Sequence, residues 1–168
     1  VAIRARDDAA AAAARTVLDR ELAAVSQPTD PSVAAGAGRP PARSIRTAAR
    51  AAGRPLGTQV ALVSVPGRHA FAEAMDALEA GIHVMLFSDN VPVEQEIALK
   101  DAAARLGLLV MGPDCGTAAV GGVGLGFANA VRPGPVGIVA ASGTGAQQVM
   151  CLLDAAGVGV SHVLGVGG

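Results

Sequence analysis

Ser142-Gly143-Thr144-Gly145 has the residue types and the spacing of an anion-binding turn. It follows an apolar run of strand length and precedes a helical pattern. The first N–H groups of a helix have no intrahelical partner, and the helix dipole favours negative charge there. Glycines let an anion approach the backbone, while Ser142 and Thr144 add hydroxyls. The string predicts an anion site, and an ordinary Ser/Thr helix cap is the alternative.

A second string, Ser88-Asp89-Asn90-Val91-Pro92, repeats this arrangement after an earlier strand-like run. Asn90 can cap the following helix, and Pro92 suits its first turn. Asp89 makes the loop less favourable to phosphate than the first string, although it could hold a hydroxyl or an amide. Capping alone is the alternative interpretation.

A third string, Gly112-Pro113-Asp114-Cys115-Gly116-Thr117, places a cysteine after a strand. A catalytic thiolate needs a nearby base or a positive field, and no His–Cys pair is visible. We therefore favour a buried or ligand-facing, unreactive Cys115. The histidines are scattered, so no metal site is predicted, and no catalytic residue can be assigned.

These strings have to be held by a regular alternation of strands and helices from Thr58 onward. The pattern predicts strands at 60–65, 83–87, 108–111, 136–140 and 162–164, with helices between most of them and a glycine-rich loop of about two dozen residues before the fourth. Such alternation predicts an α/β fold with a parallel sheet. Ligands of these sheets bind outside the carboxyl ends of the strands, where all three strings fall.

The first part of the chain has a different character. Residues 1–25 are expected to form a strand and a long Ala/Leu-rich helix, and residues 26–42, rich in Pro, Gly and Ser, a flexible linker. The chain begins and stops in strand-like runs and lacks an initial Met. We therefore expect a fragment of a longer protein.

Composition limits the classes of function. Of the 168 residues, 51% are hydrophobic and 2% aromatic, and the net charge is −1. The chain thus lacks both the aromatic platforms and the basic surface of nucleic-acid binders. No uncharged apolar run reaches the roughly 20 residues of a membrane span. Two cysteines without metal-type spacing fit a reducing, cytoplasmic location.

Four strings taken together resemble one family. These are Leu86–Val91, Gly112–Thr117, Gly126–Asn129 and Ala141–Gly145. They are similar, in this order, to FdrA-family proteins, which are relatives of the succinyl-CoA synthetase alpha subunit among the NDP-forming acyl-CoA synthetases. The resemblance is strong from about Thr58 to Gly168 and weaker over residues 1–25, which look like the end of the family's N-terminal region.

The resemblance implies a Rossmann-like, CoA-binding-type domain over residues 43–132. It implies the start of a flavodoxin-like ligase domain, truncated, over residues 133–168. In the synthetases, the segment matching Phe87, Ser88 and Asp89 contacts CoA, and the turn matching Cys115 borders the CoA thiol region. The turn matching Ser142, Gly143 and Thr144 receives the phosphate of a phosphohistidine, whose segment lies beyond the end of this chain. The implied ligands are CoA and phosphate or an acyl phosphate, and the implied partners are other subunits of a complex.

Departures from the family pattern leave three functions open. The synthetases carry a glycine-rich phosphate loop after their first strand, and none precedes Val60, which weakens the expectation of CoA binding. The first function is acyl transfer through a phosphorylated intermediate, as in an acyl-CoA ligase. The second is that of an oxamate carbamoyltransferase subunit in allantoin catabolism, which would use carbamoyl phosphate and need partner chains but no CoA. The third is a non-catalytic ligand-binding or scaffold role.

Overall fold

The structure, a computed structural model, describes residues 5–26 and 42–167. The chain divides into two units, Val1–Pro41 and Ala42–Gly168. The first contains helix α1, Asp8–Ser26, which Asp7 caps by accepting a hydrogen bond from the Ala10 N–H (2.7 Å). Nearly all of the strand predicted at residues 1–5 and nearly all of the linker predicted at 26–42 lie outside the described residues.

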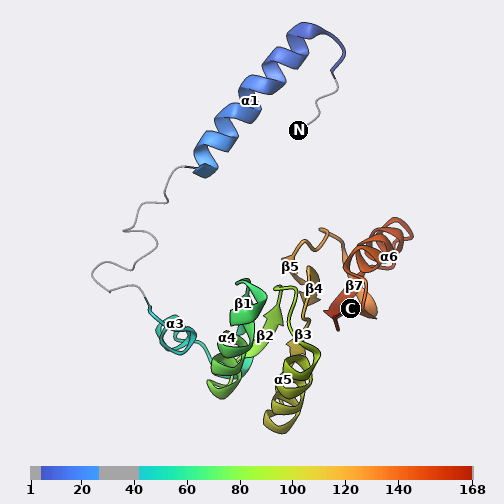
Figure 1. The fold of residues 1–168 in the computed structure, drawn as a ribbon. Coiled ribbons are helices and arrows are strands. Elements are labelled where there is room, and N and C mark those ends of the chain that lie inside the picture. Colours follow the sequence, from blue (N-terminus) through green and yellow to red (C-terminus); the bar gives the residue numbers. More distant parts are fainter. Residues whose placement is uncertain (1–4, 27–41, 168) are drawn as a thin grey trace. The chain divides into compact units, whose positions relative to one another are not determined.

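The second unit begins with a short, well-capped helix and a parallel sheet (Figure 1). Ser44 and Thr47 form a reciprocal capping box at the start of helix α3, Ile45–Ala52, and a 3₁₀ turn, η1 (Leu56–Thr58), follows. Sheet A has the order β1-β2-β3, all parallel. Its elements, in chain order, are β1 Val60–Val63, α4 Gly67–Glu79, β2 His83–Leu86, α5 Val93–Leu106 and β3 Val110–Met111.

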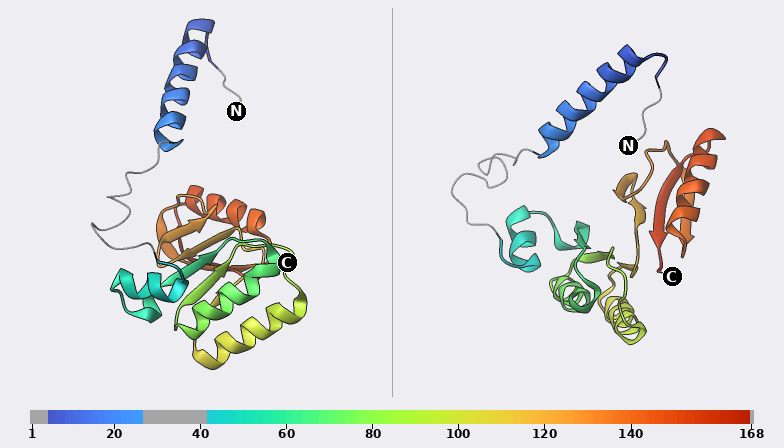
Figure 2. Two further views of the ribbon diagram at one scale, coloured as in Figure 1. Left: turned by 60° about the vertical axis from the view of Figure 1, so that its left-hand side comes forward. Right: turned by 45° about the horizontal axis from the view of Figure 1, so that its top comes forward.

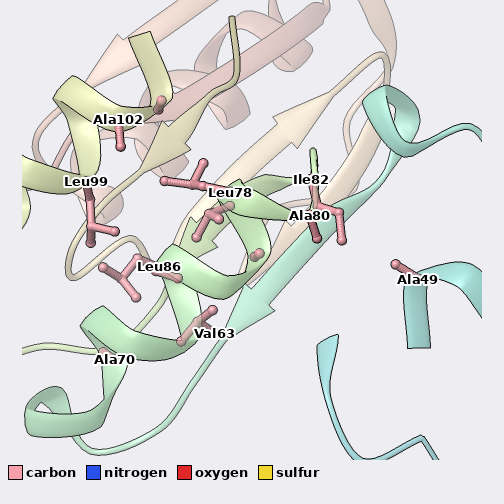
Figure 3. Close-up of a cluster of buried hydrophobic side chains, with 13 residues drawn as sticks. Ala49, Val63, Ala70, Leu78, Ala80, Ile82, Leu86, Leu99 and Ala102 are labelled. Atoms are coloured by element: carbon pink, nitrogen blue, oxygen red, sulfur yellow. The ribbon is translucent and has the colours of Figure 1, made fainter. Parts of the chain in front are cut away.

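One face of sheet A packs against α4 and α5 and forms the largest apolar cluster (Figure 3). Val63 of β1 and Leu86 of β2 meet Leu78 of α4 and Leu99 of α5, all at most 3% exposed. Burying an aliphatic side chain of this size stabilises the fold by roughly 1.5–3 kcal/mol. The cluster fixes the carboxyl ends of the strands relative to the two helix starts that follow them.

A second sheet, sheet B, contains the elements that follow Met111. Its order is β5-β4-β7-β6, in which β6 and β7 are parallel and β4 pairs antiparallel with both β5 and β7. Figure 2 shows α6 against this sheet. The elements are β4 Thr117–Val120, β5 Val123–Gly126, β6 Pro133–Ala140, α6 Gly143–Ala155 and β7 Val160–Gly165.

The predicted long loop before the fourth strand is wrong, because residues 117–126 form a tight hairpin. Its two-residue turn is Gly121-Gly122, with φ angles of 57° and 82°. Positive φ at both positions is what a two-residue hairpin turn requires, and glycine adopts it without strain. The signal was present in the sequence, since Gly-Gly is flanked by strand-forming residues.

Because β4 and β5 belong to sheet B, the change of sheet falls between Met111 and Thr117. The domain division at residue 132 stays a prediction.

The two sheets are joined by direct contacts. The Gly112 N–H donates to the Gly165 carbonyl (3.0 Å), and Lys100 of α5 donates to the Val166 carbonyl (2.8 Å). An apolar cluster of Met85, Met111, Cys115 and Ala118 lies on the face of sheet A opposite its helices. The ends of β3 and β7 are therefore held side by side. Among the described helices, none has the length and apolar character needed to cross a bilayer.

Candidate functional site

Ser88, predicted to border a ligand, uses its hydroxyl for hydrogen bonds to the backbone of the protein. Its side chain is 6% exposed. The hydroxyl accepts a hydrogen bond from the Val65 N–H (3.0 Å) and donates to the Val63 carbonyl (3.4 Å). Ser88 therefore fastens the end of β2 to the end of β1, and its hydroxyl is not free for a ligand in this arrangement.

Asp89 is exposed, but its backbone fills the space at the start of α4. A Cβ added to Gly67, the first residue of α4, would overlap the Asp89 carbonyl oxygen and lie 2.6 Å from the Asn90 carbonyl oxygen. Two carbonyl oxygens therefore cover the side of Gly67 on which a Cβ would stand. Their partial negative charges disfavour an anion on this side of the start of α4. The prediction that Asn90 caps the helix following it is wrong, because the N-cap of α5 is Pro92. The N-cap of α4 is Pro66, and neither proline makes a side-chain hydrogen bond.

Phe87, which follows β2, is half-buried and meets Phe127, which follows β5. The two rings are edge-to-face with centroids 5.4 Å apart. Phe127 is 66% exposed, although its N–H donates to the Gly116 carbonyl (2.8 Å) and its carbonyl accepts a bond from Gln147. An apolar surface on a fixed backbone thus lies between the ends of the two sheets, suited to an uncharged part of a ligand.

The start of α6 is open. Ser142 is its N-cap, and the Ser142 hydroxyl accepts a hydrogen bond from the Gly145 N–H (3.1 Å) while lying 3.5 Å from the Thr144 hydroxyl. Within the described residues, the N–H groups of Gly143 and Thr144 have no recorded partner. The first turn of α6 carries no acidic residue. The capping interpretation is confirmed, because the Ser142 hydroxyl caps the helix. The anion site stays a prediction, and the two unpartnered N–H groups are compatible with it.

Cys115 is buried, with 2% of its surface exposed. Its thiol donates to the Thr117 carbonyl (3.6 Å). Burial is the largest influence on it and raises the pKa of the thiol, and the nearby Asp114 carboxylate acts in the same direction. The thiol is therefore kept protonated at neutral pH, which suits a packing or ligand-facing role better than that of a nucleophile.

A small cavity of about 10 Å³ brings several predicted residues together. Cys115, Ser142 and Gly143 line it, and so do Asp114 and Thr117. Phe87, Ser88, Asp89 and Thr144 do not. The tertiary structure thus joins the cysteine turn to the start of α6. Thr117 was not among the predicted site residues, because the pattern predicted a loop there and not the start of a strand.

The larger cavity, of about 350 Å³, lies elsewhere, beside the β4–β5 hairpin and α6. Glycine, alanine and other apolar residues line it, together with Asn129, and no charged side chain does. Of the predicted site residues, none lies in its wall. In the described ranges, no group of three His, Cys, Asp or Glu side chains could hold a metal ion.

Comparison with known proteins identifies relatives of the chain. The uncharacterized protein YahF of Escherichia coli is 53% identical over 111 residues, which is 66% of this chain and 22% of YahF. The alpha 2 subunit of the ADP-forming succinate–CoA ligase of Archaeoglobus fulgidus is 33% identical over 119 residues, 68% of this chain and 42% of that subunit. The chain thus spans less than half of each. No family model matches it.

Solved structures agree on the fold. ATP citrate lyase from Methanothrix soehngenii, in complex with citrate and coenzyme A, superposes with a TM-score of 0.65 and 25% identity over 74% of this chain and 22% of the lyase. The dinucleotide-forming acetyl-coenzyme A synthetase 1 of Ca. Korarchaeum cryptofilum, with phosphate and ADP, gives 0.58 at 21% identity over 78% of this chain and 29% of the synthetase. The predicted resemblance to the ligase alpha subunits and the predicted α/β fold are confirmed.

Proposed function

Because the chain is related to succinate–CoA ligase alpha subunits and NDP-forming acyl-CoA synthetases, we propose that it belongs to an FdrA-type, acyl-CoA ligase-like protein. In this proposal the start of α6 holds the phosphate of an acyl phosphate or of another phosphorylated intermediate. The observation that carries it is the open helix start at Gly143 and Thr144, next to the cysteine turn. Other subunits would complete the reaction, as the ligase alpha subunits of the relatives are by name parts of larger enzymes.

The proposal assigns CoA to the neighbouring surface. Phe87 and Phe127 would contact the uncharged part of CoA, and Cys115 would lie near the thiol end of CoA. Asp89 would border the ligand, while Ser88 acts by holding the loop. The covered start of α4 is not available for the CoA phosphates, so affinity should be lower than in a protein with a glycine-rich phosphate loop.

The phosphate part is tested by titrating the ¹⁵N-labelled chain with inorganic phosphate. We expect the amide resonances of Gly143 and Thr144 to shift, and Thr144→Ala to weaken binding about three- to tenfold, since a hydrogen bond to a charged group is lost. Thr144 does not cap the helix, so the fold should be retained. Unchanged resonances at these two amides would contradict the proposal.

The CoA part is tested by calorimetry with CoA. We expect measurable binding that Phe87→Leu weakens, whereas Phe71→Leu, on α4 in the apolar cluster, leaves the affinity unchanged. Equal effects of the two substitutions would mean that Phe87 acts through stability alone.

A carbamoyltransferase subunit is the second candidate, and the covered start of α4 favours it, because carbamoyl transfer to phosphate needs no CoA. In that case carbamoyl phosphate would shift the Gly143 and Thr144 resonances while CoA gave no heat of binding. If phosphate, carbamoyl phosphate and CoA all fail to bind, both enzymatic candidates are contradicted and the scaffold role remains.

A further inference from the structure

Thr117 is the first residue of strand β4. Its side chain lies beside Gly143, the first residue of α6. Its side-chain oxygen lies 3.7 Å from the position that a Cβ on Gly143 would take, and its own Cβ lies 3.9 Å from that position. Apart from the chain neighbours of Gly143 and the backbone of α6 itself, the three atoms nearest to this position all belong to Thr117. The space beside Gly143 is therefore bounded by the threonine.

The Thr117 hydroxyl makes no hydrogen bond within the described residues. The residue is 3% exposed, but its hydroxyl oxygen is not among the fully buried, unpartnered side-chain atoms, which are Gln95 Oε1 and Asn129 Oδ1. The oxygen therefore keeps a small accessible surface. Its backbone carbonyl, by contrast, accepts the bond from Cys115. A hydroxyl that makes no hydrogen bond to the protein and keeps access to a cavity is available to water or to a ligand.

The cavity between Thr117 and Gly143 has the size of a single oxygen. Its volume of about 10 Å³ corresponds to roughly one water-sized sphere. A whole phosphate cannot enter. One of its oxygens can, while the other oxygens stay outside, next to the N–H groups of Gly143 and Thr144.

We propose that Thr117 is an anion-binding residue that donates a hydrogen bond to one oxygen of a phosphate-type ligand inserted between β4 and α6. The inference rests on the proposed anion site at the start of α6 and extends it to a second element of the fold. Donors then come from two sides of the ligand, which suits a tetrahedral oxyanion better than a flat carboxylate.

The negative charge of Asp114 repels a bound anion, and the repulsion grows with the charge of the anion. Asp114 is exposed and is one of the residues that line the same cavity. A singly charged phosphate ester or acyl phosphate therefore meets less repulsion than a doubly charged one. Removing this charge with Asp114→Asn should strengthen phosphate binding about two- to fivefold, the range expected for a partly exposed charge pair.

The test compares Thr117→Val, which keeps the shape and removes the hydroxyl, with Thr117→Ser, which keeps the hydroxyl. Each variant of the 168-residue chain is titrated with inorganic phosphate, and binding is followed at the amides of Gly143 and Thr144. We expect at least about tenfold weaker binding for the valine variant and a change below about threefold for the serine variant. Thermal unfolding of both variants confirms that they are folded.

Two outcomes separate this inference from the proposed function. If wild-type protein binds phosphate at α6 and the valine variant binds equally well, Thr117 does not contact the phosphate. The cavity then holds only water. If the wild-type amides do not respond to phosphate at all, the anion site itself is refuted and the inference with it.

Discussion

Helices α4 and α6 both begin with a glycine that is separated from a parallel strand by two or three residues, yet the surroundings of the two glycines differ. At Gly67 the carbonyl oxygens of Asp89 and Asn90 occupy the space that a ligand would need. At Gly143 the nearest neighbour is the Thr117 side chain, at ordinary contact distance. The same local motif therefore gives a closed packing contact in sheet A and an open polar site in sheet B.

The third helix start, that of α5, is unsuited to anions for a different reason. Glu94 and Glu96 lie in its first turn, and their charges already satisfy the positive end of the helix dipole. Of the helix starts that follow strands in the described residues, α6 alone is open and free of acidic residues. Position at the carboxyl end of a parallel strand is thus insufficient to identify an anion site.

The largest expected effect is on stability and separates the two glycines. Gly67→Ala should lower the free energy of unfolding by about 2–4 kcal/mol, because the added methyl must displace the Asp89–Asn90 backbone. Gly143→Ala should leave it unchanged or raise it by up to about 1 kcal/mol, since alanine is the better helix former. Urea denaturation of both variants measures this. Equal destabilisation would show that the start of α6 is as closed as that of α4.

A smaller effect concerns capping. Ser142→Ala removes the acceptor of the Gly145 N–H and should cost about 1 kcal/mol of stability. Pro66, at the corresponding position of α4, provides no side-chain hydrogen bond, so no comparable bond exists there to lose. Thr144→Ala is the matched control within α6, and thermal unfolding should show a loss for Ser142→Ala that clearly exceeds that of the control.

The smallest effect concerns the acidic start of α5. Glu94→Gln should lower stability by about 0.3–0.5 kcal/mol, because one favourable charge–dipole interaction is lost. The variant should show no phosphate-induced shift at the amides of residues 93–95. A phosphate response there equal to that at Gly143 would mean that charge, and not the openness of the helix start, distinguishes the two sites.

Much of the fold could be predicted from local pattern. The predicted helices and parallel strands from Thr58 onward are present with shifts of a few residues at their ends, because apolar periodicity and glycine at helix ends are properties of neighbouring residues. The hairpin at residues 117–126 was missed because glycine density was taken as a sign of a loop, although Gly-Gly between strand-forming residues also indicates a tight turn.

The candidate site could be predicted only in part. The helix start at Ser142, Gly143 and Thr144 was predicted correctly, because a helix start is encoded within four residues, and phosphate binding there stays a prediction. Ser88 was expected to face a ligand, but it bonds to Val63 and Val65, more than 20 residues away in the sequence. No local pattern contains such a contact.

The sequence by itself determined that Ser142 caps α6 and leaves two N–H groups unpaired, since both follow from the chemistry of three consecutive residues. Only the tertiary structure decided which helix start is open. The Asp89–Asn90 backbone closes α4, and the pairing of β4 with β7 puts β4, which begins at Thr117, and the Cys115 turn just before it beside Gly143. Close packing of a backbone segment against a helix start, and the placing of a polar side chain beside it, depend on residues that are distant in the chain. Such contacts exist only once the sheets have formed.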